Sequence, residues 1–305
     1  MATKAKPKKM KKQHTPDYYP VQRTIPMSGT QAANGQIVAG TMVADAGRLL
    51  SQSNRRLYRY GMNYRIKLDL DVSEAIAQGF NVEVFALRNN WDVQRAFALA
   101  KEAYDKAVAD ELDMTNAGRW SDFRVSDGVT GAIDLHPVTI DNATLAETVL
   151  ASGEHALSLV DRAGTGVNFS WGLASATNIS IRDEWIQSGN TSSEPGTPLT
   201  SAPYDGLTAD NMSDVEMTGL TNNGNDPPYN ATSDGDLLYR VGILRYEPAT
   251  PTGTGLQKLS TGFFDAPCGL FVIKVSAGIN LPAGIVSMTA QAGKYKGIAA
   301  DKMCQ

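Results

Sequence analysis

The sequence predicts an all-β fold, in which two antiparallel sheets pack as a sandwich. Two observations carry this prediction. Short apolar runs recur along the body, and clusters rich in glycine, proline, asparagine and aspartate separate them. Only one long stretch has the periodicity of a helix, so the helices that would connect parallel strands are lacking.

Residues 1–36 are predicted to form a disordered basic arm. They contain four prolines and little apolar periodicity, so they bury too little surface to offset the entropy of ordering. The body, residues 37–305, is predicted to be one β domain. The first twelve residues hold six lysines and no acid. These lysines are Lys4, Lys6, Lys8, Lys9, Lys11 and Lys12.

The clearest strand spans Tyr64–Val72, where apolar and polar residues alternate strictly. A second strand is predicted at Val82–Leu87. Further apolar runs predict strands at residues 123–125, 133–140, 155–160, 167–173, 178–181, 237–246, 269–276 and 284–290. Turn-separated strands without helical crossovers favour a sandwich of the jelly-roll type.

The stretch 92–112 is predicted to be a single α-helix inserted between strands. Its apolar residues recur at helical spacing, and alanine is abundant. Asp92 in the first turn favours the helix dipole. The segment 187–236 has a different composition, with eight acidic residues and no lysine or arginine. It is predicted to be a long acidic surface loop or a small projection.

Charge is segregated along the chain. Residues 1–67 carry 13 basic and 2 acidic side chains, whereas residues 68–305 carry 15 basic and 30 acidic ones. A strongly basic end on an acidic body is typical of a segment that binds a polyanion. Flexible lysines would neutralise phosphates without reading sequence. The run Pro7–Lys12 also matches a short nuclear-import signal, and a tail that only aids solubility is the third interpretation.

A second basic cluster, Arg48–Lys67, interleaves arginines with tyrosines. Within it, we expect a phosphate-binding surface made by Arg55, Arg56 and Arg59. Tyr58, Tyr60 or Tyr64 would then stack on bases. The alternative is a basic strand edge that pairs with acids of a neighbouring strand or subunit. Arg65 and Lys67 fit this structural role better, because they alternate with a core face.

Signatures of catalysis are weak. The motifs of metalloproteases, hydrolases, dinucleotide-binding folds and P-loops are absent from the sequence. Cys268 is interpreted as a small buried hydrophobe. We therefore expect no enzymatic activity and no cofactor. The pairs Asp69/Asp71 and Asp234/Asp236 suggest calcium between subunits, but solvated strand and turn residues explain them better.

Three segments resemble capsid proteins of small non-enveloped viruses with circular single-stranded DNA genomes. These segments are residues 54–61 (NRRLYRYG), 118–125 (GRWSDFRV) and 266–272 (APCGLFV). The segments resemble in particular the bacilladnavirus type, which has a jelly roll like that of nodaviruses. The resemblance implies a jelly-roll subunit, icosahedral self-assembly and a genome packaged against the inner face. It implies no catalytic residue.

The leading hypothesis is therefore a structural capsid subunit. Its expected partners are copies of itself and the viral genome, and the expected nucleic acid is single-stranded DNA. A host import receptor would be a further partner, and the expected locations are the virion and, during assembly, the host nucleus. Membrane insertion is not expected, because the sequence has no apolar run of about 18 residues. The alternatives are a non-viral nucleic-acid-binding β protein and a carbohydrate-binding or hydrolytic β-sandwich.

Overall fold

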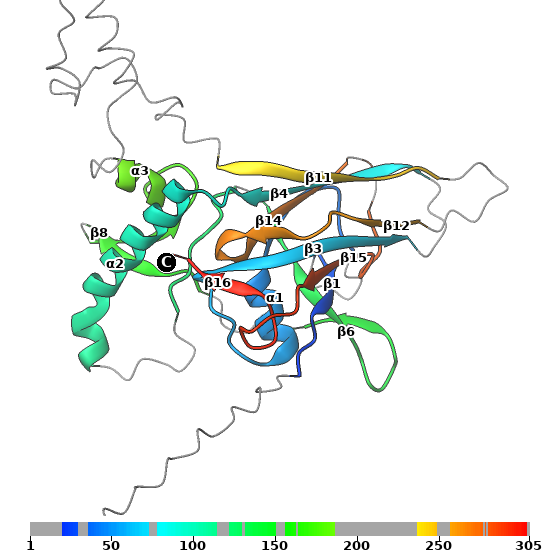
Figure 1. Cartoon of the computed structure of the whole chain (residues 1–305), viewed down its shortest axis with the longest axis horizontal. Coiled ribbons are helices and arrows are strands. Elements are labelled where there is room, and N and C mark those ends of the chain that lie inside the picture. The colour runs from blue at the N-terminus through cyan, green and yellow to red at the C-terminus, as the bar shows by residue number, and fades with distance from the viewer. Residues whose placement is uncertain are drawn as a thin grey trace, which may run out of the picture.

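The computed structural model describes residues 20–29, 36–72, 78–114, 122–129, 132–150, 156–162, 164–186, 237–248, 257–276, 278 and 280–303. These residues form a mainly β protein with antiparallel sheets (Figure 1), which confirms the predicted fold class. The six arm lysines, the acidic segment 187–236 and the pair Asp234/Asp236 lie outside the described residues.

Two sheets form the main body. Its eight principal strands are β1 (Thr24–Ser28), β2 (Gly40–Asp45), β3 (Met62–Val72), β4 (Phe80–Leu87), β11 (Leu238–Tyr246), β12 (Gln257–Ser260), β14 (Leu270–Val275) and β15 (Val286–Ala290). One sheet contains the order β12-β3-β15-β1, and the other contains β11-β4-β14-β2. Along the chain, the first strand therefore pairs with the eighth, the second with the seventh, the third with the sixth and the fourth with the fifth.

The alternation in β3 explains why this strand was visible in the sequence. Every second side chain, from Tyr64 to Val72, points into the core between the two sheets and is fully buried. Each such side chain contributes about 1.5–3 kcal/mol. On the other face, Arg65 pairs with Asp265 of the neighbouring strand β13 (Phe264–Ala266) at 3.0 Å. This contact is the structural role expected of Arg65.

The predicted boundary of the arm at residue 36 is wrong, because residues 24–28 form β1. This strand lies inside the sheet between β15 and β6 (His136–Ile140), and both Ile25 and Met27 are fully buried. It pairs with β15 up to Pro26 and with β6 from Met27 onward. Proline lacks the N–H of a continuous ladder, so it fits a position where the strand changes partner.

The prediction of a single helix is also wrong, although the predicted helix 92–112 is confirmed by α2 (Trp91–Met114). The sequence analysis missed α1 (Ala46–Asn54) and α3 (Ile181–Trp185). Helix α1 is short, and it begins where the Asp45 carboxylate accepts a hydrogen bond from the Arg48 N–H at 3.1 Å. An aspartate in this position is a strong N-cap.

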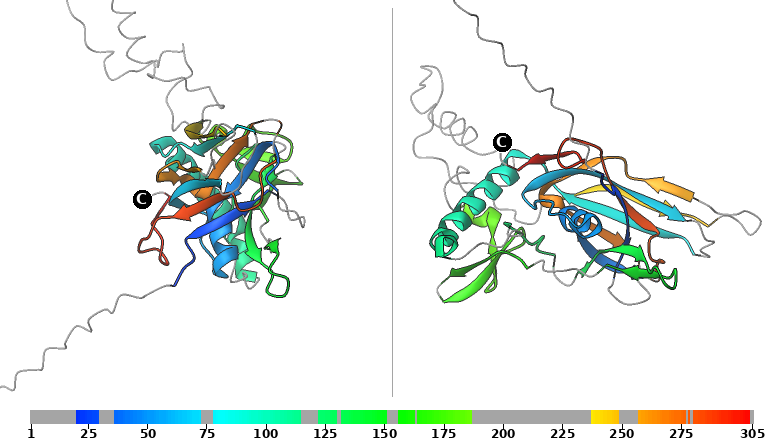
Figure 2. Two further views of the ribbon diagram at one scale, coloured as in Figure 1. Left: turned by 90° about the vertical axis from the view of Figure 1, so that its right-hand side faces the viewer. Right: turned by 90° about the horizontal axis from the view of Figure 1, so that it is seen from below.

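A long insertion, residues 88–237, separates β4 from β11. It contains α2, β5 (Ile133–Asp134), β6, β7 (Glu147–Val149), β8 (Leu159–Arg162), β9 (Thr165–Ser170), β10 (Asn178–Ser180) and α3. The first part of α2 packs with α3 and the separate sheet β10-β9-β8 around a second apolar core (Figure 2). Several strands that the sequence predicted for the sandwich thus belong to this separate unit.

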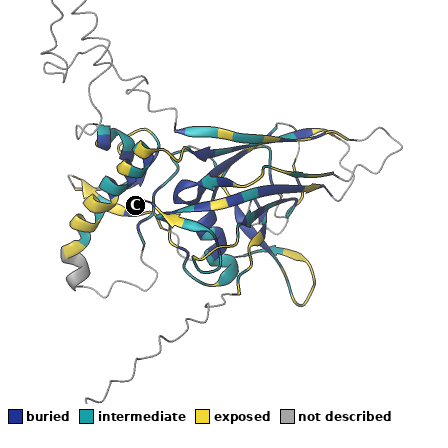
Figure 3. Ribbon diagram, in the orientation of Figure 1, coloured by how far each residue is buried: buried dark blue, intermediate teal, exposed yellow. Residues whose placement is uncertain are grey.

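Part of the insertion returns to the sandwich. Strand β5 pairs parallel with β2, and β6 pairs antiparallel with β1, so the insertion extends both sheets. The remaining elements, the short 3-10 helix η2 (Pro267–Gly269) and strand β16 (Ala300–Lys302), complete the described fold. Buried residues concentrate between the sheets and on one side of α2 (Figure 3). Cys268 is buried in η2, as predicted.

Candidate nucleic-acid interface

The chain that leads to the arm lysines enters the fold at the end of α1. The Gln22 N–H donates to Asn54 Oδ1 at 2.7 Å, and Asn54 Nδ2 donates to the Gln22 carbonyl at 3.1 Å. Asn54 immediately precedes Arg55 and Arg56. Lys12 lies ten positions before Gln22, so the chain limits the distance between their Cα atoms to at most about 35 Å. The first described part of the arm and the basic loop after α1 are therefore neighbours.

Arg55 and Arg56 occupy this loop. Arg55 is exposed and adopts the left-handed conformation (φ 49°) that ends α1, with its N–H bonded to the Ser51 carbonyl. Arg56 is half-buried and its side chain hydrogen-bonds the Tyr58 hydroxyl. Arg55 is thus exposed to solvent, whereas Arg56 is only half-exposed.

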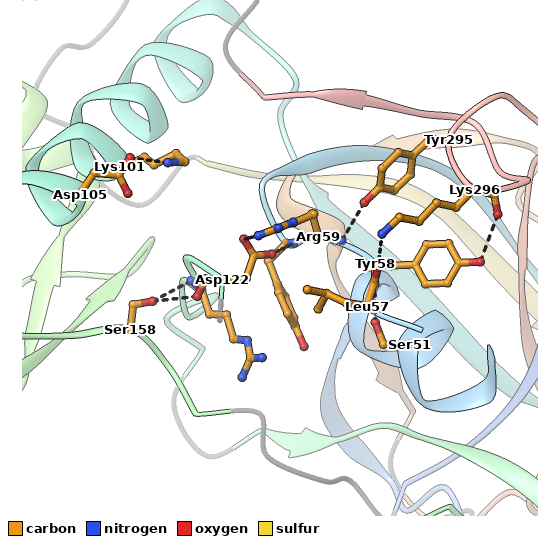
Figure 4. A network of polar contacts seen from close by, with 12 residues as sticks. Ser51, Leu57, Tyr58, Arg59, Lys101, Asp105, Asp122, Ser158, Tyr295 and Lys296 are labelled. Carbon is orange, nitrogen blue, oxygen red and sulfur yellow. Dashed lines mark hydrogen bonds and ion pairs between the residues drawn. The ribbon is translucent and has the colours of Figure 1, made fainter. Parts of the chain in front are cut away.

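Arg59 is engaged by the insertion. Its Nη1 lies 3.2 Å from the Asp122 carboxylate, which also accepts the Tyr60 N–H at 2.8 Å (Figure 4). The Arg59 N–H donates to the Tyr295 hydroxyl at 3.0 Å. The Asp122 side chain is only 10% exposed, whereas that of Arg59 is 53% exposed. Asp122 therefore compensates part of the Arg59 charge and joins the basic loop to the insertion.

Lys296 is a basic residue that the sequence analysis missed. Its Nζ donates to the Leu57 carbonyl, and it lies over the Tyr295 ring at 5.3 Å. Burial lowers the Lys296 pKa, and the positive charges of Arg59 and Arg56 lower it further. Because its partner carbonyl belongs to Leu57, the Lys296 ammonium lies at the loop that carries Arg56 and Arg59. Because 237 residues separate Lys296 from Arg59, only the fold reveals the cluster.

The expected base stacking by tyrosines is wrong. Tyr58 and Tyr64 are fully buried, and Tyr60 is 5% exposed. Their hydroxyls serve the fold: Tyr58 donates to the Lys296 carbonyl at 3.2 Å, and Tyr64 donates to the Arg59 carbonyl. These tyrosines hold the basic loop in place, and their rings are not accessible to bases.

The Asp69/Asp71 pair is neutralised within the chain. Lys67 lies 2.9 Å from Asp69, and Lys258 lies 3.6 Å from Asp71. Burial opposes ionisation of Asp69, but hydrogen bonds from Lys67, Ser260 and Thr289 outweigh it and lower its pKa. In the described part of the chain, no group of three or more histidine, cysteine, aspartate or glutamate residues is arranged to hold a metal ion.

Comparisons with known proteins identify no family. No protein-family model, no curated protein and no solved structure matches the chain. The helices of the described residues are all too short or too polar to cross a membrane. The functional argument therefore depends on the fold and on the contacts of the basic loop.

Proposed function

We propose that the protein is a structural capsid subunit that self-assembles into a closed shell and packages nucleic acid through its basic N-terminal arm. One observation carries the proposal. Gln22, the residue through which the chain enters the sandwich, is hydrogen-bonded to Asn54, which directly precedes Arg55 and Arg56, and Lys296 contacts the same loop at Leu57. Phosphates that bind there would release counterions from both the arm and the basic loop.

The strand order supports the jelly-roll part of this proposal. In a jelly roll, a long antiparallel ribbon pairs its first strand with its last, its second strand with its last but one, and continues in this way to its middle. Rolled up, such a ribbon gives two four-stranded sheets in which consecutive strands alternate between sheets, except the fourth and fifth, which pair within one sheet. The observed pairings of β1 with β15, β2 with β14, β3 with β12 and β4 with β11 follow this scheme. The insertion interrupts the ribbon between β4 and β11.

The β6–β7 hairpin supports self-assembly. Leu145 at its tip is 77% exposed and adopts a positive φ of 56°, which is unfavourable for leucine. The Asp141 carboxylate accepts hydrogen bonds from the N–H groups of Ala143 and Thr144 at 2.7 and 2.8 Å. The tip is therefore held in shape while it presents an apolar side chain to solvent, and we propose it as a contact between subunits.

Replacing Leu145 with aspartate is expected to weaken assembly and leave the fold intact. Aspartate tolerates the left-handed conformation better than leucine, so the urea midpoint should stay the same or rise. The assembled fraction, measured by analytical ultracentrifugation at equal concentration, should fall. Leu173→Asp, at another exposed position (67% exposed), is the control for a general effect of added charge. Unchanged assembly of L145D would remove this hairpin from the subunit contacts.

Replacing Arg55 with glutamate is expected to weaken binding to single-stranded DNA without destabilising the protein. One lost phosphate contact on single-stranded DNA lowers the slope of log K against log [salt] by about 0.7. Arg240→Glu is the matched control. It changes the net charge by the same amount at an exposed arginine on β11, which lies in the sheet β11-β4-β14-β2. Fluorescence anisotropy over a salt series measures both. Equal losses in the two variants would mean that net charge alone, and not the basic loop, governs binding.

A further inference from the structure

A cavity of about 330 Å³ lies where the insertion meets the sandwich. The end of β2 and the start of α1 supply one wall, and residues 124–127 together with β5 supply the other. Its charged and titratable lining residues are Asp45, Arg48, Tyr60, Arg124, Asp127 and Asp134. Three carboxyl groups and two guanidinium groups thus face one small space.

The contacts across this space connect the two units. Arg48 Nη1 lies 2.9 Å from Asp134 Oδ2, and Arg48 Nη2 donates to His136 Nδ1 at 3.3 Å. From the insertion, the Arg124 guanidinium stacks on the Tyr60 ring at 4.7 Å. Asp127 Oδ2 is buried and has no hydrogen-bond partner. An unpaired carboxylate oxygen in this position is costly when charged and much less so when protonated.

The titration of the two least compensated carboxyls follows from their surroundings. Burial raises the pKa of Asp45 to about 7, against the opposing effects of hydrogen bonds from the Arg48 and Gly47 N–H groups and of the charges on Arg48 and Arg124. Burial also raises the pKa of Asp127 to about 6, against hydrogen bonds from the backbone N–H groups of residues 127–129, and the negative charge of Asp134 adds to the shift.

Three other titratable groups around the cavity also have shifted pKa values. Burial and the charge of Arg48 lower the pKa of His136, against the opposing charge of Asp134, so this ring is neutral at pH 8.0. Burial, the main cause, and the charge of Asp45 raise the pKa of Tyr60, and the same two effects raise that of Tyr64. Ionisation of Asp45 and Asp127 adds two negative charges to the cluster.

We propose that this cluster is a pH-sensitive latch, which holds the insertion against the sandwich while Asp45 and Asp127 are protonated and loosens when they ionise. Both groups bind protons more tightly in the closed state than in the open one. The free energy of opening therefore falls as the pH rises from about 4 to about 7 and is constant above that range. The latch does not depend on the proposed capsid function, since it concerns contacts within one chain.

Hydrogen exchange of the full-length protein at pH 5.5 and pH 8.0, corrected for intrinsic rates, tests the latch. Between pH 5.5 and pH 8.0, the linkage relation predicts that the equilibrium constant for opening residues 122–134 rises about a hundredfold. Asp45 contributes about thirtyfold of this rise and Asp127 about fourfold. The amides of β3 in the sandwich core exchange through global unfolding, so at pH 8.0 they should stay better protected than residues 122–134 if the opening is local. Equal protection of residues 122–134 at both pH values in the wild-type protein would overturn the proposal.

Two substitutions assign the effect to its residues. Asp45→Asn keeps a good N-cap for α1 and should leave only the roughly fourfold change that Asp127 supplies. The double variant Asp45→Asn/Asp127→Asn should show almost no dependence on pH. Asp161→Asn, at an exposed aspartate of β8, should behave as wild type. A double variant whose hydrogen exchange depends on pH as strongly as that of the wild type would likewise overturn the proposal. If the variants do not fold, the measurement on the wild-type protein alone decides the proposal.

Discussion

Deleting residues 2–28 is expected to abolish folding, whereas deleting residues 2–19 should leave the sandwich intact. The longer deletion removes β1 from between β15 and β6, together with the fully buried Ile25 and Met27. Each of these side chains contributes about 1.5–3 kcal/mol, and the two sheet neighbours also lose their backbone partners. Total stabilities of about 5–15 kcal/mol do not tolerate such a loss.

Circular dichroism during thermal unfolding measures this difference. The 2–19 deletion should unfold cooperatively near the wild-type temperature, and the 2–28 deletion should show no cooperative transition. Ile25→Asp in the full-length chain is a second variant, because it disrupts the same strand without shortening the protein. A cooperative transition of the 2–28 deletion at the wild-type temperature would show that β1 is dispensable.

Replacing the six arm lysines with glutamine is expected to lower nucleic-acid binding strongly while leaving assembly possible. The substitution keeps the length of the arm and removes only its charge. For single-stranded DNA, the salt slope of binding should fall by about 4, which corresponds to six lost phosphate contacts. The ratio of absorbance at 260 and 280 nm of purified particles measures packaging. Particles of the substituted protein that package as well as wild type at physiological salt would contradict the role of the arm.

Much of the sandwich was predictable because its strands alternate over many residues. β3 and β4 show this pattern clearly, and the predicted runs at 237–246, 269–276 and 284–290 coincide with β11, β14 and β15. The helix at 92–112 was equally visible, since α2 has 24 residues. Long segments with a regular spacing of apolar residues can therefore be recognised from the sequence alone.

β1 and α1 were missed because their signals are short. β1 has five residues around Pro26, and in sequence it merges with the proline-rich arm. α1 has nine residues, and its main signal is the cap at Asp45. The sequence also gave no reason to place β8–β10 apart from the sandwich, because strands of a separate sheet alternate in the same way as those of the main one.

The candidate site was predictable only in part. Arg55 and Arg56 were chosen from charge density, and the structure places them beside the point where the arm enters the fold. The burial of Tyr58 and the approach of Lys296 depend on contacts between residues more than 200 positions apart, which the local sequence does not encode. The pairing of Arg59 with Asp122 is likewise a property of the packed insertion.

Negative-stain imaging of the purified full-length protein, combined with gel filtration over a range of salt and pH, tests the central claim most directly. If the protein is a capsid subunit, closed particles of roughly 20–40 nm should form, because 60–180 copies related by symmetry would make up a shell. A species of 32.7 kDa that never assembles at any salt concentration or pH would contradict the claim.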